Sequence, residues 1–72
     1  PRVLVTGETT VLDNVKKLLV LTDTQIVVFN GRRYTSVAGR DFVVTKLKEE
    51  RMLVAGEVDE IRFFKALQED KD

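Results

Sequence analysis

The tripeptide Val-Ala-Gly occurs twice in this chain, at residues 37–39 and 54–56. Each copy lies inside a run of β-branched and aromatic residues, a composition typical of β-strands. A glycine within a strand adds no side chain to the sheet surface, so it commonly marks a bend, a bulge or the close approach of a neighbouring group. The repeat therefore predicts two strands that meet the same geometric demand. A duplicated binding element is the alternative interpretation.

The alternation of apolar residues changes phase after each copy of the tripeptide. Val37 and Gly39 share one face of a strand by alternation, whereas Phe42 has the opposite parity. One residue must therefore be absorbed near residues 40–41, as a bulge or a sharp bend does. A second change of phase falls across residues 59–60. Two neighbouring bent strands predict a sheet that curls towards a barrel or a sandwich.

A polar segment between the two copies, residues 46–51, predicts a hairpin turn centred on Glu49. This turn pairs Val44 with Val54 and places Phe42 opposite Gly56. An aromatic ring that lies across a glycine fills the missing side-chain volume. We therefore expect Phe42 and the glycines Gly39 and Gly56 to be structural residues.

A second turn is expected at Asn30-Gly31, which follows a dense β run at residues 25–29. Both residues tolerate positive φ, which suits a two-residue type I′ hairpin loop and makes them structural residues as well. Such a loop places Phe29 opposite Arg32. The return strand is predicted to end at Ala38.

The amino-terminal part is less clear from local pattern. Residues 3–6 are predicted to form a first short strand, and Gly7 ends it. Over residues 10–19 the apolar spacing fits an amphipathic helix, although the last leucines also alternate as in a strand. The residues themselves slightly favour the helix.

The length and composition restrict the chain to one small domain with little scope for catalysis. The 72 residues predict a single domain at residues 1–64 with a marginal core, followed by a polar tail at residues 65–72 that is frayed or disordered. There is no cysteine and no histidine, so disulfides, thiolate nucleophiles, Cys/His zinc sites and imidazole bases are unavailable. We expect no enzyme activity, no cofactor, no metal and no small-molecule ligand.

The balance of charge argues against nucleic acid as a partner. The chain has 12 basic and 12 acidic residues, whereas nucleic-acid binders usually carry a basic excess. Arg32, Arg33 and Arg40, with Tyr34 among them, could contact an anionic surface, or they could simply keep a strand edge soluble. Phe64 should point outward beside a core-facing neighbour and is a candidate for a contact surface.

No window is long and apolar enough for a membrane span, and no signal peptide is recognisable. The initial Pro1 suggests either removal of a methionine or an excised domain. A cytoplasmic location is the resulting expectation.

An ordered set of spacings extends over about residues 2–64 and resembles the YabP/YqfC family of small sporulation proteins from endospore-forming bacteria. The positions that carry it are Val15, Leu21, Thr22, Asp23, Ile26, Val28, Gly31, Val37, Gly39, Phe42, Val44, Leu47, Met52, Val54, Gly56, Val58, Ile61 and Phe63. Each of these positions is a common residue type, and the order of the spacings carries the likeness. The chain is shorter than typical members and lacks their polar extensions.

The resemblance implies a compact all-β, immunoglobulin-like sandwich or curled antiparallel sheet of about six to seven short strands. It favours a strand over residues 15–21, with an α+β fold carrying a helix at residues 10–19 as the alternative. It further implies a non-enzymatic interaction module that takes part in spore coat or cortex formation. The partners would be proteins, including a membrane-associated sporulation protein, and the location the cytoplasm or envelope of a sporulating cell.

Two further expectations follow from the residues. A small sandwich with unpaired strand edges is suited to self-association as a homo-oligomer. A small nucleic-acid-binding β-barrel is the alternative function, and it would use Arg32, Arg33, Tyr34 and Arg40.

Overall fold

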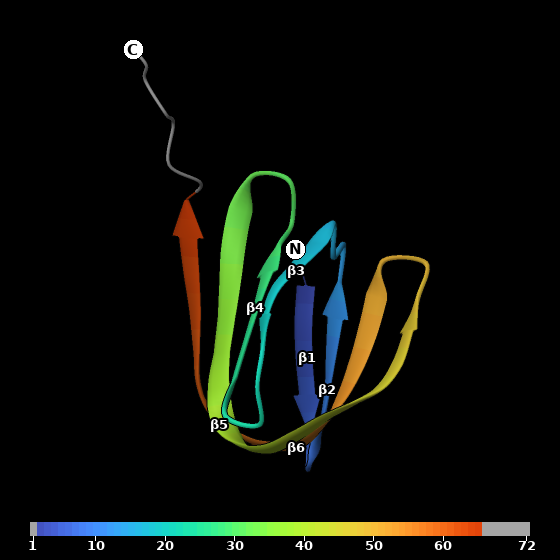
Figure 1. The fold of residues 1–72 in the computed structure, drawn as a ribbon, viewed down its shortest axis with the longest axis vertical. Helices are drawn as coiled ribbons and strands as arrows, with labels where there is room; N and C mark the ends of the chain where they lie inside the picture. The colour runs from blue at the N-terminus through green and yellow to red at the C-terminus, as the bar shows by residue number, and fades with distance from the viewer. Residues whose placement is uncertain (1, 66–72) are drawn as a thin grey trace.

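The chain folds into a single antiparallel sheet, and the computed structural model describes residues 2–65 of it (Figure 1). The strands are β1 (Arg2–Thr6), β2 (Thr9–Asp13), β3 (Lys17–Leu21), β4 (Gln25–Phe29), β5 (Arg33–Lys48) and β6 (Arg51–Lys65). Their order across the sheet is β1-β2-β6-β5-β4-β3. The predicted all-β class and the curled antiparallel sheet of six strands are therefore confirmed.

The two ends of the predicted domain differ in what the structure covers. Lys65 is the last residue of β6, so the strand runs one residue beyond the predicted boundary. The rest of the predicted tail, residues 66–72, lies outside the described residues. Within residues 2–65 there is no helix, so the alternative α+β fold is wrong for residues 10–19.

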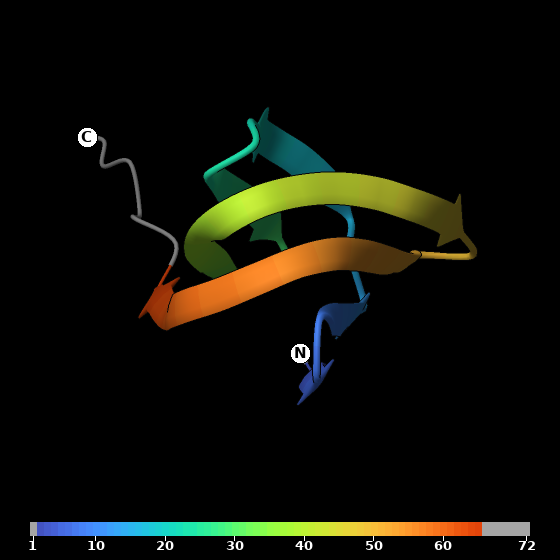
Figure 2. The ribbon, with the colours of Figure 1, turned by 90° about the horizontal axis from the view of Figure 1, so that it is seen from below.

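The sheet is folded over because β5 and β6 both bend near their middles. Figure 2 shows the two strands side by side as arcs, with the β3–β4 hairpin on one side and the β1–β2 hairpin on the other. β4 pairs with the first part of β5, and β2 pairs with the first part of β6. Each half of the sheet thus combines one short hairpin with one half of each long strand, so that the two halves follow the same plan.

Side chains from both halves form one core. The buried apolar residues come from β2, β4, β5, β6 and the β2–β3 connection, and they are Leu12, Val15, Ile26, Val28, Val37, Phe42, Met52 and Val54. In the short strands β2 and β4 the buried positions alternate with more exposed ones. This period of two is expected when one face of a strand packs inward.

The two predicted changes of phase are β-bulges at the bend. Asp41 and Phe42 of β5 together face Gly56 of β6, and Asp59 is an additional residue on β6. Asp41 has a φ of 58°. Each extra residue reverses which face the following side chains occupy and increases the local bend. The strand expected to end at Ala38 instead continues through the bend to Lys48, which corrects that prediction.

The ring of Phe42 fills the space beside both repeated glycines. A methyl group on Gly56 would lie 2.7 Å from Cδ1 of Phe42 and 2.8 Å from the carbonyl oxygen of Arg40. On Gly39 it would lie 2.8 Å from Cζ of the same ring and would overlap the carbonyl oxygen of Glu57. The expected contact between Phe42 and Gly56 is confirmed, and Gly39 shares it.

The same backbone contact anchors each copy of the tripeptide. The N–H of Gly39 donates to the carbonyl oxygen of Thr24 at 2.9 Å, and the N–H of Gly56 donates to the carbonyl oxygen of Glu8 at 2.8 Å. Thr24 lies in the β3–β4 turn and Glu8 in the β1–β2 turn. The two copies of the tripeptide therefore occupy equivalent positions, because the N–H of each glycine binds the turn of the neighbouring short hairpin.

The segment between β1 and β4 departs from the predicted strand over residues 15–21. β2 was not expected as a strand, β3 begins at Lys17, and Val15 lies in the connection between them. The N–H of Val15 donates to the carbonyl oxygen of Glu50 at 2.8 Å, and its side chain is buried. Leu12 and Val15 both enter the core from extended backbone, and their spacing imitates a helical face.

The turn after β4 is shifted from the predicted position. Phe29 faces Tyr34 instead of Arg32, and the N–H of Asn30 donates to the carbonyl oxygen of Arg33 at 2.8 Å. The loop residues are therefore Gly31 and Arg32, with positive φ at Gly31. The predicted Asn30-Gly31 loop is wrong by one residue at each end.

Asn30 has a different structural role, which explains the shift. Its Nδ2 donates to the carbonyl oxygens of Asp13 at 3.2 Å and Asn14 at 3.1 Å, and its Oδ1 accepts a hydrogen bond from Oγ1 of Thr35 at 2.8 Å. The side chain thus joins the β2–β3 connection to the start of β5. These bonds hold Asn30 in the β4–β5 pairing, opposite Arg33, so the loop begins one residue later.

The β5–β6 turn is centred between Glu49 and Glu50, half a residue beyond the predicted centre at Glu49, and the extra residue Thr45 on β5 compensates for the difference. Val44 faces Val54 as expected, and the tip consists of Glu49 and Glu50, both with positive φ. Two positive φ values are the requirement of a type I′ loop. The carboxylate of Glu50 also binds Lys16 Nζ at 2.9 Å.

Substitution of Gly7 and Gly56, two of the three positive-φ glycines, should separate strain from crowding. Gly7 (φ 61°) has open space around it, whereas Gly56 (φ 135°) faces Phe42 and two carbonyl oxygens. Gly7→Ala should lower the free energy of unfolding by about 1 kcal/mol, and Gly56→Ala by about 3 kcal/mol or more because overpacking adds to the strain. Urea unfolding measures both values. Equal losses would contradict the role assigned to the Phe42 contact.

A second pair of substitutions tests the two buried threonines, which are each 1% exposed. Among the described residues Thr10 Oγ1 has no hydrogen-bond partner, whereas Thr35 Oγ1 donates to Asn30. Thr10→Val should raise the free energy of unfolding by about 1 kcal/mol, and Thr35→Val should lower it by about 1–2 kcal/mol. Thermal and urea unfolding would report the opposite signs. Changes of the same sign would show that the two hydroxyls are equivalent.

Candidate interaction surface

No cluster of side chains suited to metal binding is present in the part of the chain that the structure describes. It contains no group of three acidic, histidine or cysteine side chains that could hold a metal ion. It also contains no helix suited in length and apolarity to crossing a bilayer. The remaining candidates for a functional region are hollows and exposed apolar surface.

A polar hollow of about 410 Å³ lies at the tip of the β5–β6 hairpin and is lined by Asp13, Asn14, Lys48, Glu49 and Arg51. Within it, Arg51 Nε donates to Asp13 Oδ1 at 2.7 Å. Small-molecule sites are mostly apolar concavities with a few convergent polar groups. This hollow has the opposite character, and two of its charged groups, Arg51 and Asp13, are engaged with each other.

Exposed apolar side chains are frequent for so small a domain. Among residues 2–65, nine large hydrophobic residues are at least 39% exposed: Leu4, Val5, Leu18, Leu19, Leu21, Val43, Leu47, Phe63 and Phe64. Most of them lie on β1, β3 and the outer parts of β5 and β6, which are the strands and segments at the edges of the sheet. Clustered exposed apolar residues commonly mark contact surfaces.

The second half of β6 has a free edge. β2 pairs only with Met52–Ala55 of β6, and β5 pairs with β6 on the opposite side up to Lys65. No described strand therefore covers residues 57–65 on their outer side, as Figure 1 shows at the end of β6. An uncovered strand presents backbone N–H and C=O groups to which another strand can pair.

The two phenylalanines near the end of β6 point to opposite faces. Phe63 faces Thr35, which faces the buried Val28, so Phe63 lies on the core side of the sheet. Phe64 lies on the outer side, as the alternation predicted. Both rings are about half exposed, Phe63 at 51% and Phe64 at 45%. Phe63 is exposed despite its inward orientation, because no described strand pairs with the free edge of β6 beside it.

Phe64 belongs to an aromatic row across three strands. It faces Tyr34 on β5, and Tyr34 faces Phe29 on β4. The ring centroids of Phe29 and Tyr34 are 5.1 Å apart, with the planes inclined by 43°. This geometry is favourable for an aromatic pair. The row ends in the exposed ring of Phe64, at the free edge of β6.

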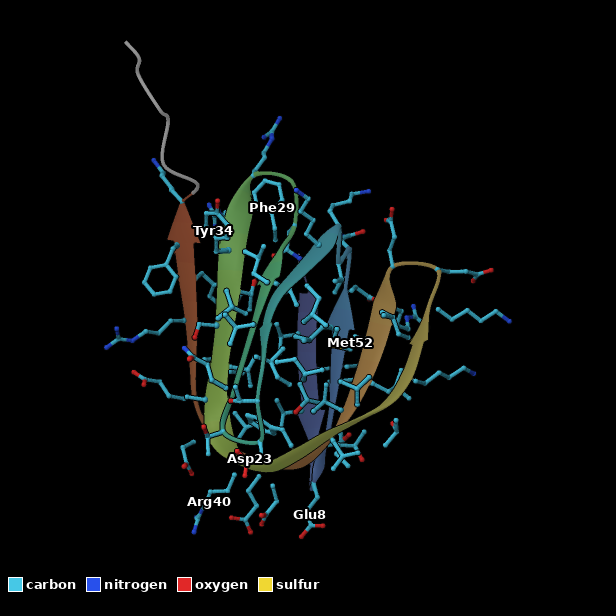
Figure 3. All side chains as sticks on the ribbon, viewed as in Figure 1. Glu8, Asp23, Phe29, Tyr34, Arg40 and Met52 are labelled. Carbon is cyan, nitrogen blue, oxygen red and sulfur yellow. The ribbon has the colours of Figure 1, made fainter. Side chains whose placement is uncertain are left out.

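The four residues predicted as a basic patch are not brought together. Arg32 lies in the turn before β5 and Arg33 and Tyr34 are its first two residues, whereas Arg40 lies at the bend (Figure 3). In Figure 3, Tyr34 and Arg40 occupy opposite ends of the sheet. Arg40 also pairs with Glu57 at 3.0 Å. The structure thus separates one member of the predicted patch and neutralises its charge.

Sequence reasoning identified Phe64 and Tyr34 but missed two features of this surface. Phe29 was expected opposite Arg32, so its contact with Tyr34 could not be anticipated. The free edge was missed because the pairing of β2 with β6 was not recognised. The alternation of Ile61, Phe63 and Phe64 was the available signal, and it correctly assigned the outward ring.

Comparisons with protein-family models, with curated proteins and with solved structures found no match to this chain. The function proposed below is therefore supported by the sequence resemblance and by the geometry of the surface.

The exposed ring of Phe64 should contribute little to folding. Phe64→Ala should lower the free energy of unfolding by about 1 kcal/mol or less, because it removes one half-exposed cross-strand contact with Tyr34. Phe42→Ala should cost about 3–5 kcal/mol, because it leaves a cavity in the core. Chemical unfolding of the two variants provides the comparison. A large loss with Phe64→Ala would identify the ring as a core residue.

Proposed function

We propose that this chain is a non-enzymatic interaction module of sporulation that takes part in forming the spore envelope, its coat or cortex, through contacts with other proteins. The sporulation context is supported by the resemblance to the YabP/YqfC family, with its spaced glycines and apolar residues. The interaction role is supported by the half-exposed phenylalanines at the uncovered end of β6.

Exposure of the Phe63 and Phe64 rings to water is unfavourable, which supports an interaction role for this end of β6. Burying apolar surface contributes about 25 cal/mol per Å², so a protein partner that covered Phe63 and Phe64 would gain from both rings. Aromatic residues are also enriched among the residues that dominate binding at protein interfaces. Backbone groups along the same edge would add hydrogen bonds to any partner strand.

The non-enzymatic part of the proposal follows from the chemistry that is available. The chain has no histidine and no cysteine. Its carboxylates lie mostly in turns or on outward faces, and several are paired with arginine or lysine. A hydrolase built on paired carboxylates holds two of them on either side of a substrate in a cleft, whereas several of these carboxylates are engaged with basic side chains on the surface.

Deletion of the gene in an endospore-forming bacterium that carries it should yield spores with reduced resistance to heat and to lysozyme. Complementation with the wild-type chain should restore resistance, and a Phe64→Ser chain should fail to restore it. Val43→Ser is the matched control, because Val43 is 60% exposed and lies on β5 away from the β6 edge. Immunoblotting confirms equal levels of the three chains.

Two outcomes would contradict the proposal. Fully resistant spores after deletion would remove the role in the spore envelope. Equal complementation by the Phe64 and Val43 variants would show that the end of β6 is not the surface through which the module acts.

A further inference from the structure

The sheet has four free edges in the described residues, and they differ in regularity. β1 is a strand of five residues, and β3 has an irregularity between Leu18 and Val20. The free part of β5 contains register shifts between Arg40 and Val43 and between Val44 and Lys46. Bulges and short length are devices that prevent strands from pairing with other molecules. The edges of β3 and β5 are thus irregular, and that of β1 is short.

The end of β6 is regular only after its own bulge at Asp59. From Glu60 to Lys65 it follows β5 without any register shift, with Glu60 facing Ala38 and Lys65 facing Arg33. Its free side therefore presents a regular ladder of backbone groups. The core-side residue Ile61 is half-buried and packs against the core, and Phe63 beside it is 51% exposed. A strand added here would extend the sheet and cover both side chains.

The charges at the end of β6 make it complementary to a second copy of the same strand. Glu60 and Arg62 are on the outer face on either side of Ile61, and Arg62 Nε donates to Glu60 Oε2 at 2.9 Å. Both side chains are more than half exposed. When two identical strands pair antiparallel about Ile61, Glu60 of each copy lies directly opposite Arg62 of the other. The sequence is then complementary to itself at both positions.

Neighbouring two-fold registers lack this complementarity. A pair centred on Arg62 would place two guanidinium groups opposite each other, and a pair centred on Glu60 would oppose two carboxylates. Like charges directly opposite in a sheet are destabilising. Alternation also forbids registers centred between residues, because directly opposed side chains must share a face.

We propose that two copies of this chain associate by antiparallel pairing of their β6 edges, with Ile61 on the two-fold axis. The sheets of the two copies then join through the regular segments at residues 60–62, and Phe63 of each copy lies opposite the bulge residue Asp59 of the other. Each Glu60 carboxylate then contacts the Arg62 guanidinium of its own chain and that of the second copy. The inference shares the β6 surface with the proposed function, and it rests on that proposal only in taking this end of β6 to be a contact surface.

Charge reversal provides a test that a merely structural ion pair would not pass. Glu60→Arg and Arg62→Glu should each raise the dimer dissociation constant at least about tenfold, because like charges face each other in the homodimer. The loss should shrink at high salt. An equimolar mixture of the two variants should dimerise again, because the charges of the two chains are complementary. Sedimentation equilibrium measures all four samples.

A cysteine substitution tests the register directly, since the chain has no native cysteine. Directly opposed residues of an antiparallel pair have Cα atoms about 4.5–5.5 Å apart, within the range that a disulfide spans. Ile61→Cys should therefore form a covalent dimer under mild oxidation. Val43→Cys, an exposed position on β5, is the matched control and should remain monomeric on a non-reducing gel.

The results decide between this dimer and its alternatives. A wild-type chain that stays monomeric at every concentration would overturn the proposal, as would a dimer that is indifferent to both charge reversals. If each variant dimerises weakly and their mixture does not dimerise again, the Glu60–Arg62 ion pair acts only within one chain, which would also contradict the proposal. These readouts use purified protein, so they can fail while spore resistance still depends on Phe64, and the reverse.

Discussion

The contact between one phenyl ring and two glycines determines how this chain turns an open sheet into a folded one. Phe42 lies against Gly39 and Gly56 where β5 and β6 bend together. Larger residues at either glycine would meet the ring and backbone carbonyl oxygens, and a smaller residue at Phe42 would leave a cavity between the two halves. The core depends on this bend, because each half of the sheet carries apolar side chains that only the other half can cover.

The bend could be predicted from the sequence because strand alternation has a period of two. Any extra residue reverses the faces of all those that follow, so the bulges at Asp41 and Asp59 are visible as changes of phase. The position of Phe42 then follows from counting back from the turn at Glu49. The outward orientation of Phe64 was predicted by the same count, since no register shift lies between Glu60 and the end of the strand.

Other features depend on partners distant in sequence and could not be predicted. β2 is short and pairs with β6, so its local pattern gave no sign of a strand, and the free edge that begins where this pairing stops was missed with it. In the sequence Asn30 resembles a loop residue, but its position depends on hydrogen bonds to the carbonyl oxygens of Asp13 and Asn14, which are distant in the chain. Arg40 follows Tyr34 closely in sequence, but the strand carries it to the opposite end of the sheet.

The arrangement of two short hairpins on one long hairpin has a consequence for biosynthesis. The strands β1 to β4 leave the ribosome before β5 and β6, yet β2 and β4 need those later strands as neighbours. The turn at Glu49 and Glu50 joins partners that are close in sequence, so the last hairpin can close quickly once it is made. The apolar residues of the first half of the chain therefore stay uncovered until β5 and β6 have been synthesised and can pair with β4 and β2.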